Sequence, residues 1–368
     1  MNQNHGGLKI TVHRGTKEIG GNCIEIATES TRIILDVGMP LFDADRNPFD
    51  TRILQGKSAT ELLEAGILPR VEGLFTEGRM PDAILISHAH MDHTGFLSYT
   101  RSEIPVYATS GTSKMMSAGA IFARQTEIPR DRFRRLTPQV PSVIGDIRVT
   151  PFSVDHSAYG GVATLIEGGG KTVLYSGDIR LHGRKTGMAK TLLTALKDKA
   201  VDLLLIEGTL LGGDRSTGFD EYDLEATITE RIAHCKGLVL ASFSPQHVDR
   251  LVCFMRAAQR TRRVLVVDVY TAYIMHLIGS EVKIPEPKMS EGIRVFYPQH
   301  FRESSSRKGL GKVHDKFLGD RIELDEILEE PEKHVMLFRT SMLDSDFCGK
   351  VPEGTLCLFS RWEGYLEQ

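Results

Sequence analysis

The chain has 368 residues, of which 41% are hydrophobic and 25% are charged, a composition typical of a globular protein with more than one domain. Its 45 lysines and arginines nearly balance 48 aspartates and glutamates, and the net charge of −3 excludes a strongly basic, histone-like nucleic-acid binder. No apolar run reaches the ~18 residues of a membrane helix, and the N-terminus lacks the apolar segment of a secretory signal.

The cysteines indicate a reducing environment. They are odd in number and scattered, with no CxxC pair, at Cys23, Cys235, Cys253, Cys348 and Cys357. Such a set predicts neither a disulfide scaffold nor a thiolate zinc site. We therefore expect a cytoplasmic protein without a membrane attachment.

The first two hundred residues predict short strands interleaved with helices. β-branched residues recur at alternate positions in LKITVHR, CIEIAT and RIILDVG, the pattern of an antiparallel meander. Further strands are expected over residues 83–88, 105–109, 147–154, 162–168, 172–178 and 202–208, and helices over 111–126 and 187–199. This mixture predicts a layered α/β domain over residues 1–208.

From residue 209 the pattern changes to a regular alternation of helices and strands. Helices are expected over residues 222–236 and 245–260, the second with Ser244 as N-cap and Pro245 at its first position. Strands are expected in GLVLASF, RVLVVDV, IRVFYP, HVMLF and TLCLFS. The alternation predicts a parallel sheet with right-handed crossovers in a second domain, residues 209–368. The polar segment 302–316 is expected to be a mobile loop.

The segment SHAHMDHTG, residues 87–95, directly follows an apolar strand. Residues two apart in an extended chain point the same way, so His88 and His90 can share one ion at ~2.0–2.1 Å each. Asp92 and His93 then fall in the following turn, where they can hold a second ion. Four ligand-type residues at this spacing favour a metal centre over a loop that is rich in histidine by chance.

Three more ligand-type residues follow apolar strands. They are His156 in FSVDHS, Asp178 at the end of LYSGD, and Asp36 at the end of RIILD. A single aspartate at a strand end is usually a turn former. Three such ends in a chain that also carries the histidine motif predict one shared site, because loops at strand ends gather functional residues.

These motifs resemble the metallo-β-lactamase superfamily and, within it, the β-CASP nucleases of the RNase J and cleavage-factor type. The resemblance is carried by EIGGNCIEI, ILDVGMP, SHAHMDHTG, DHSAYG, YSGDIRLHG and IEGT, and more loosely by HVMLFRTSMLDSDF and LFSRWEGYLE. It implies an αββα sandwich for the first domain and a β-CASP-type parallel α/β domain for the second.

The resemblance also implies a role for each residue of the predicted site. The first metal would be held by His88, His90 and His156. The second would be held by Asp92 and His93, with Asp178 bridging the two ions and Asp36 orienting the cluster from beneath. Glu207 matches the acidic residue that opens the β-CASP insert and supports a ligand histidine; the alternative is an ordinary carboxylate at a strand end. Asp92, Asp178 and Glu207 are the expected catalytic residues.

One part of the family pattern is missing from the sequence. The family places a histidine-rich SGHA-type segment and a final ligand histidine after the insert, whereas this sequence ends at SRWEGYLEQ without either. We therefore expect a chain that is truncated at its C-terminus, with a weaker or incomplete second metal site.

The function implied by the resemblance is phosphodiester hydrolysis, most simply by an RNase J-like ribonuclease that uses a metal-bound hydroxide. Zinc suits a site rich in histidine, and manganese is a credible substitute. The expected substrate is single-stranded RNA, with DNA as an alternative. The motifs fit cleavage within the RNA and cleavage from its 5′ end equally well.

Candidate RNA contacts lie in the segment ASFSPQHVDRLVCFMR. A helix N-terminus offers free N–H groups to a phosphate, and in the family that the chain resembles this loop lies along the RNA. Ser244, His247 and Arg250 are therefore candidates; the alternative is simple helix capping with a solvent-facing arginine. Arginine clusters at residues 130–135 and 260–263 either line a nucleic-acid backbone or lie on a solvated face.

Two other classes of function compete with the nuclease. A small-molecule metallo-hydrolase, acting on a thioester or a lactone, usually ends soon after its last ligand strand, whereas a long segment follows Gly208 here. A non-catalytic subunit of a processing complex tends to lose its metal ligands, whereas all six predicted ligands are present here.

Overall fold

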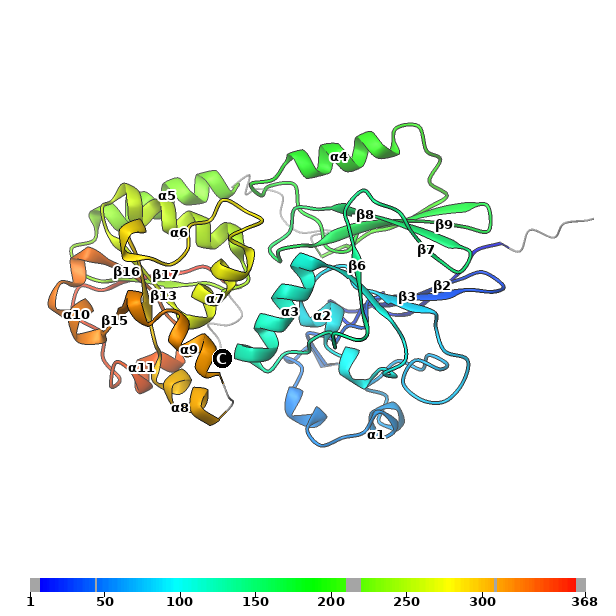
Figure 1. Ribbon diagram of the computed structural model, residues 1–368, viewed down its shortest axis with the longest axis horizontal. Coiled ribbons are helices and arrows are strands. Elements are labelled where there is room, and N and C mark those ends of the chain that lie inside the picture. Colours follow the sequence, from blue (N-terminus) through cyan, green and yellow to red (C-terminus); the bar gives the residue numbers. More distant parts are fainter. Residues whose placement is uncertain (1–6, 44, 210–219, 308–309, 362–368) are drawn as a thin grey trace, which may run out of the picture. The chain divides into compact units, whose positions relative to one another are not determined.

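The computed structural model describes residues 7–43, 45–209, 220–307 and 310–361 (Figure 1). The chain divides into two compact units. Unit 1 comprises Met1–Leu181 and Lys185–Arg215, and unit 2 comprises His182–Arg184 and Ser216–Gln368. The division lies near the expected boundary after residue 208, but three residues of the first expected domain, 182–184, pack with unit 2. Residues 362–368, which carry the end of the loosely matching tail motif, lie outside the described residues.

The first sheet of unit 1 has six strands in the order β1-β2-β3-β4-β5-β6. Their bounds are Lys9–Arg14, Cys23–Ala27, Arg32–Leu35, Ala83–Leu85, Val106–Thr109 and Phe133–Leu136. The first three strands are antiparallel, as their alternating residues predict, and β3 to β6 run parallel. Every residue of β3 and β4 is buried, which is the usual condition of parallel strands covered on both faces.

The second sheet of unit 1 has five strands in the order β11-β10-β9-β8-β7. From β7 to β11 their bounds are Ser142–Ile144, Ile147–Ser153, Val162–Gly168, Lys171–Tyr175 and Leu203–Leu205. Strands β10 and β11 are parallel, and the other neighbours are antiparallel. Short helices and turns in unit 1 are α1 (Ala59–Glu64), α2 (Met91–Thr94) and 3-10 turns at Thr51–Leu54 and Leu97–Tyr99.

The two sheets of unit 1 share one apolar core. Ile33 of the first sheet and Val149 of the second belong to the same buried cluster. Helix α4 (Gly187–Leu196) packs on the second sheet through Leu192, and α3 (Ser110–Ala123) packs against β5 of the first. Helix, sheet, sheet and helix form the αββα sandwich that the resemblance implied, so this part of the fold prediction is confirmed.

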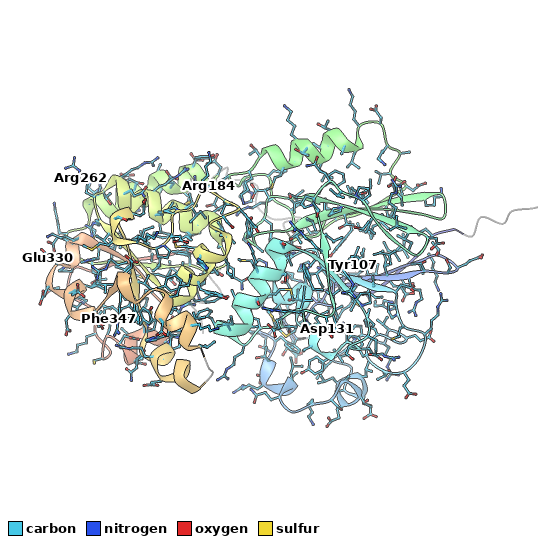
Figure 2. The ribbon with its side chains drawn as sticks, viewed as in Figure 1. Tyr107, Asp131, Arg184, Arg262, Glu330 and Phe347 are labelled. Carbon is cyan, nitrogen blue, oxygen red and sulfur yellow. The ribbon has the colours of Figure 1, made fainter. Side chains whose placement is uncertain are left out.

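Unit 2 is built on six parallel strands in the order β15-β14-β13-β16-β12-β17. From β12 to β17 their bounds are Val239–Ser242, Val264–Asp268, Ile293–Phe296, Arg321–Ile322, His334–Leu337 and Leu356–Phe359. Leu240, Val266 and Phe347 (labelled in Figure 2) belong to its apolar core. The parallel α/β prediction for the second half is confirmed.

The helices of unit 2 precede and separate these strands in the chain, with α5 before β12. From α5 to α11 their bounds are Glu221–His234, Val248–Arg260, Val269–Ile278, Gln299–Arg307, Gly311–Lys316, Leu324–Glu329 and Ser341–Ser345. A buried carboxylate on α5, Glu225, pairs with Arg184 of the segment 182–184 (labelled in Figure 2). Since both side chains are almost fully buried, each needs the other as its counter-charge.

The mobile loop expected over residues 302–316 is wrong, because α8 and α9 occupy most of this segment. The residue directly before the segment, Phe301 of α8, is buried with its ring 6.1 Å from that of Tyr297. The hydroxyl of Tyr297 also donates to the carbonyl of His314 at 2.7 Å. Contacts with residues outside the polar run therefore fold a segment that composition alone assigns to a loop.

Helix α6 begins at Val248, three residues later than the sequence predicts. The N–H of His247 donates to the carbonyl of Ser244 at 2.9 Å, which closes a turn with Pro245 at its second position, where the fixed φ of proline fits. The N-cap is His247, whose Nδ1 accepts from the N–H of Arg250 at 3.1 Å. The expectation that Ser244 caps the helix is therefore wrong.

Within the described residues, none of the helices is both long enough and apolar enough to traverse a bilayer. All five cysteines are free thiols. Burial raises the pKa of Cys23 and of Cys253 to about 12, so these two thiols stay protonated and act as packing groups, since the thiolate is the reactive form.

A buried ion pair connects β2 with β3 in unit 1. Oε2 of Glu25 lies 3.0 Å from Nη2 of Arg32 and 3.2 Å from Nε2 of His13. The hydrogen bond with His13 and, against the effect of burial, the hydrogen bonds and charge of Arg32 lower the pKa of Glu25 to about 2. In the folded protein the carboxylate is therefore ionised above about pH 2, and in that range its charge balances the charge of Arg32.

We expect Glu25→Gln to lower the free energy of unfolding by about 3–5 kcal/mol at pH 7, because Arg32 loses its buried counter-charge. The folded-state pKa lies below the unfolded value of about 4.3, so the carboxylate stabilises the fold fully above about pH 5 and less as the pH falls toward 2. Urea denaturation at pH 7 and pH 3 should show the difference between wild type and variant shrinking by roughly half or more. Glu64→Gln, on an exposed carboxylate of α1, is the control. An equal difference at both pH values would contradict this prediction.

Candidate functional site

The histidine motif leaves β4 at its C-terminal end and enters the single turn of α2. His90 occupies the N-cap position in extended backbone, and His93 lies in the last turn. The side chains of His88 and His93 are each 1% exposed. The N–H of Val37, which follows β3, donates to the carbonyl of His93 at 2.9 Å. Two neighbouring strand ends thus hold the motif in one conformation.

Gly38 allows these two segments to come together. A Cβ atom at this position would lie 1.7 Å from the carbonyl oxygen of Asp92, a distance that no side chain tolerates. The N–H of Met39 next to it donates to the carbonyl of Met91 at 3.0 Å. The glycine of ILDVGMP is therefore required by the close approach of the two backbones.

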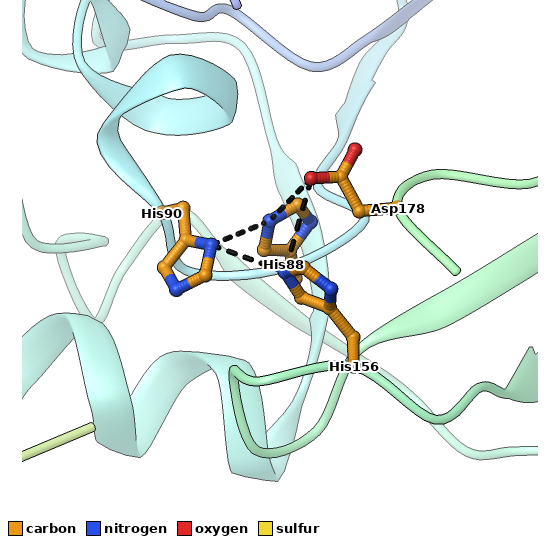
Figure 3. Close-up of side chains that lie close together, drawn as sticks. All are labelled: His88, His90, His156 and Asp178. Carbon is orange, nitrogen blue, oxygen red and sulfur yellow. Dashed lines mark hydrogen bonds and ion pairs between the residues drawn. The ribbon is translucent and has the colours of Figure 1, made fainter. Parts of the chain in front are cut away.

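Three imidazoles and one carboxylate converge at the first group of ligands (Figure 3). Nδ1 of His90 lies 3.1 Å from Nε2 of His88 and 3.1 Å from Nε2 of His156. Oδ2 of Asp178 lies 3.8 Å from the same two Nε2 atoms. Ligand atoms bound to one tetrahedral ion at ~2.0–2.1 Å lie about 3.3 Å from one another. The four side chains therefore fit a single ion without rearrangement of the fold.

A second group consists of His88, Asp92 and His93, whose ligand atoms lie within 4.8 Å of one another. Nε2 of His93 lies 3.1 Å from Oδ1 of Asp178 and 3.6 Å from Oδ2 of Asp92. Asp178 therefore turns one oxygen toward each group, which is the arrangement a bridging carboxylate requires. The structure brings together all six residues that the sequence analysis proposed as ligands.

The protonation of the imidazoles differs between the two groups. Burial, together with the neighbouring imidazoles, lowers the pKa of His88 well below its usual value, and burial lowers that of His156 to about 3. Burial acts against the charged form of His93 as well, but Asp36, Asp178 and Asp92 raise its pKa well above the usual value. Metal ligation requires neutral imidazole, so a cation bound here would replace the proton on His93 as the counter-charge of these carboxylates.

Asp36 lies beneath the cluster and is fully buried. Its carboxylate accepts from the N–H and the Oγ of Ser87, both at 2.7 Å, and from the hydroxyl of Tyr175 at 2.6 Å. It also lies 2.7 Å from Nδ1 of His93, which leaves Nε2 of that ring to face Asp92 and Asp178. The φ angle of Asp36 is +57°, a left-handed conformation that aspartate tolerates better than most residues.

Glu207 follows β11 by two residues, and the support of a ligand histidine expected of it stays a prediction. Its Oε1 accepts from the backbone N–H of Ile179 at 2.8 Å. Ile179 is the residue after Asp178, so the carboxylate steadies the loop that carries the bridging ligand. The sequence indicated an acidic residue near the site, but which donor it meets depends on how two loops pack.

Sequence reasoning missed several side chains that lie around the ligands. Besides Ser87 and Tyr175, Asn22 lies with its Nδ2 3.2 Å from Nε2 of His93. Asp155 is almost fully buried beside His156. A signal was present for all four, because each stands inside a motif that carried the resemblance; their roles depend on tertiary contacts.

The candidate RNA contacts lie in unit 2 and differ in accessibility. Ser244 is exposed and His247 is half-buried. Arg250 is largely buried, with Nη2 3.2 Å from Oε1 of Glu221, a buried carboxylate, and Nη1 directed at Ser360. The alternative of a solvent-facing arginine is therefore wrong. A phosphate contact of Arg250 stays a prediction, and a phosphate would have to share this guanidinium with Glu221.

Three arginines of the two basic clusters have partners within the fold. Nε of Arg132 donates to the carbonyl of Ile104 at 2.9 Å, and its side chain is buried. Nη1 of Arg263 donates to the carbonyl of Gly237 at 2.8 Å, and Arg260 lies 2.6 Å from Glu225. A run of arginines in sequence does not reveal which of them have partners in the fold.

Comparisons with known proteins agree with this fold. The family model described as a beta-lactamase superfamily domain matches residues 64–266. Ribonuclease J of Mycolicibacterium smegmatis is 28% identical over 263 residues, which cover 69% of this chain and 43% of that protein. An RNase J-like protein of Methanocaldococcus jannaschii is 23% identical over 276 residues, covering 71% of this chain and 58% of that protein. The chain spans about half the length of these curated relatives.

A solved structure extends the likeness beyond the region that the family model matches. A protein of unknown function from Enterococcus faecalis V583 has a TM-score of 0.71 and 20% sequence identity. The likeness covers 95% of this chain and 87% of that one. At this identity it concerns the fold, and the fold it supports includes most of the segment that follows residue 266.

Proposed function

The chain belongs to the metallo-β-lactamase superfamily, and on that premise we propose that it is a metal-dependent phosphodiester hydrolase acting on single-stranded RNA. Its relatives named Ribonuclease J indicate the β-CASP branch of the superfamily. One observation carries the proposal. Two ligand groups share His88, and Asp178 turns one carboxylate oxygen toward each, an arrangement suited to two neighbouring divalent ions.

The chain's own residues determine what such a site can do. Buried His88 and half-buried His90 and His156, whose pKa values all lie below the usual value, would hold a first ion through their neutral rings, and Asp178 would contribute its carboxylate to both groups. Divalent ions in this position supply Lewis-acid polarisation of a phosphoryl oxygen and a water molecule with a pKa lowered toward ~7. We propose zinc, with manganese as a substitute, because nitrogen-rich groups suit zinc while carboxylate-rich ones also accept manganese.

Several features favour RNA hydrolysis over the alternatives. All six expected ligands converge, which supports an enzyme and argues against a non-catalytic subunit. The curated relatives named above are ribonucleases by name, which supports RNA over a thioester or a lactone, and DNA is the second nucleic acid to test. In unit 2 we propose Ser244, His247 and Arg250 as contacts to the RNA backbone, with Ser244 the most accessible of the three. We also propose a cytoplasmic location, supported by five free thiols.

The proposal is tested by metal content and cleavage in one preparation. We expect protein purified without chelators to retain zinc or manganese by elemental analysis, and to cleave a 5′-labelled single-stranded RNA. EDTA should abolish cleavage, and added zinc or manganese should restore it. A DNA oligonucleotide of the same sequence, and the lengths of the labelled products, distinguish the substrates and the modes of cleavage.

A double variant, His88→Ala with His90→Ala, is the control for this experiment. It removes two of the four side chains of the first group, so it should carry no metal and show no cleavage. A wild-type protein that binds neither zinc nor manganese, or that cleaves RNA equally well in EDTA, would overturn the proposed function.

A further inference from the structure

Two separate loops of unit 1 each supply one ligand to the first group. The loop after β8 carries His156, and the loop after β10 carries Asp178. Asp155 immediately precedes His156 and is 3% exposed. A buried carboxylate needs charged or hydrogen-bonded partners, and its partners show what it holds together.

Asp155 makes three bonds to the loop that carries Asp178. Its carbonyl accepts from the N–H of Arg180 at 2.9 Å, and its Oδ1 accepts from Nε of the same arginine at 3.0 Å. Its Oδ2 accepts from the N–H of Lys185 at 2.8 Å. The arginine is also largely buried. The backbone carbonyl and the side-chain carboxylate of Asp155 thus bind the neighbouring loop at two places, Arg180 and Lys185.

These bonds close a small ring that contains both ligands. The chain runs from His156 to Asp155, crosses to Arg180 through two hydrogen bonds, and returns through two peptide units to Asp178. Oδ2 of Asp178 lies 3.8 Å from Nε2 of His156. Since the ring has few free torsions, the pair Asp155–Arg180 restricts how far the two ligand atoms can move apart.

We propose that Asp155, paired with Arg180, is a positioning residue that sets the separation of His156 and Asp178 and thereby the affinity of the first metal site. This inference rests on the proposed function, because it takes the group His88, His90, His156 and Asp178 as a metal site. Asp155 acts through the backbone and through Arg180.

The expected effect is a loss of metal affinity in the folded protein. Asparagine has the size of aspartate, but it lacks the charge that Arg180 requires and places an amide group where two N–H donors now converge. Loss of a residue that orients metal ligands typically costs about 10–100-fold in metal affinity. We expect Asp155→Asn to weaken zinc binding by at least about tenfold, measured by competition with a chromophoric chelator.

A second variant keeps the test valid if Asp155→Asn fails to fold. Arg180→Met removes the guanidinium and retains the backbone N–H that binds the carbonyl of Asp155. It should weaken zinc binding in the same direction. The double variant should lose little more zinc affinity than the single variant with the larger loss, because both substitutions remove the same interaction.

Glu25→Gln is the matched control, since Glu25 is also a buried carboxylate of unit 1 that pairs with an arginine, Arg32. It should lower the melting temperature in EDTA and leave zinc affinity unchanged. Asp155→Asn should change zinc affinity and the visible spectrum of the cobalt-loaded protein, a readout that a general loss of stability does not alter.

The outcomes separate this inference from the function on which it rests. If the wild type fails to bind zinc, the proposed function fails. If the wild type binds zinc and both Asp155→Asn and Arg180→Met bind it with unchanged affinity and an unchanged cobalt spectrum, the positioning role is overturned while the metal site stands. Weaker zinc binding in Glu25→Gln as well would also overturn it, because any buried ion pair would then have the same effect.

Discussion

Asp178→Asn should lower the rate of RNA cleavage by about 10³-fold or more, since the charge stabilisation in such sites amounts to several kcal/mol and ~1.4 kcal/mol is a factor of ten. The carboxylate faces His93 through Oδ1 and both His88 and His156 through Oδ2. Asparagine keeps the shape but supplies one neutral oxygen, so it cannot serve both groups.

The rate is best measured under single-turnover conditions with saturating zinc or manganese, so that weaker metal binding and slower cleavage are separated. Burial disfavours the charged form of Asp178, but His93 and the other histidines lower its pKa, so the wild-type carboxylate is ionised throughout the neutral range. Asp198→Asn, on an exposed carboxylate of the same unit, should cleave like wild type. Wild-type rates in Asp178→Asn would exclude the bridging role.

Asp36→Ala should reduce stability and metal content together. The carboxylate of Asp36 is the common acceptor for Ser87, Tyr175 and His93 in a fully buried position. Each buried donor left without an acceptor costs about 1–3 kcal/mol, and the positive φ of Asp36 adds about 1 kcal/mol for alanine. We expect a loss of about 3–5 kcal/mol, the range measured when a buried charged network loses one partner.

Chemical denaturation in EDTA isolates the loss of stability from the loss of metal. Asp36→Asn is the matched comparison, because asparagine accepts the left-handed backbone and keeps one acceptor oxygen, so its loss should be smaller. If Asp36→Ala were as stable as wild type, the hydrogen bonds beneath the cluster would not hold His93 in place.

The predictability of the site follows the distance along the chain over which each residue acts. The ligands of the HxHxDH motif could be predicted because their geometry is local: a strand, an extended step and a turn place four side chains within seven residues of sequence, 87–93. His156 and Asp178 needed the resemblance, since strand ends only suggest a shared edge. Asp155 was missed because its partners, Arg180 and Lys185, meet it only after two loops have packed.

The same distinction applies to the fold. While the αββα order of the layers came from the resemblance, alternation and apolar runs predicted the antiparallel start, the parallel second half and a layered α/β first domain. They failed for α8, where burial of Phe301 decides the structure of a polar segment, and for the start of α6, where a turn at Pro245 takes precedence over capping. Charge in the sequence was equally ambiguous, because Arg132 and Arg250 are indistinguishable in sequence from arginines that face solvent.

The excursion of residues 182–184 into unit 2 bears on how this protein can be divided in the laboratory. The chain passes between the units three times, so no single cut yields two complete halves. A fragment that ends near residue 208 would carry Arg184 without Glu225, and the complementary fragment would carry a buried carboxylate stripped of one of its arginines. When unit 2 is exchanged between relatives, residues 182–184 of the loop that follows Asp178 are better exchanged with it. Arg184 and Glu225 then come from the same protein.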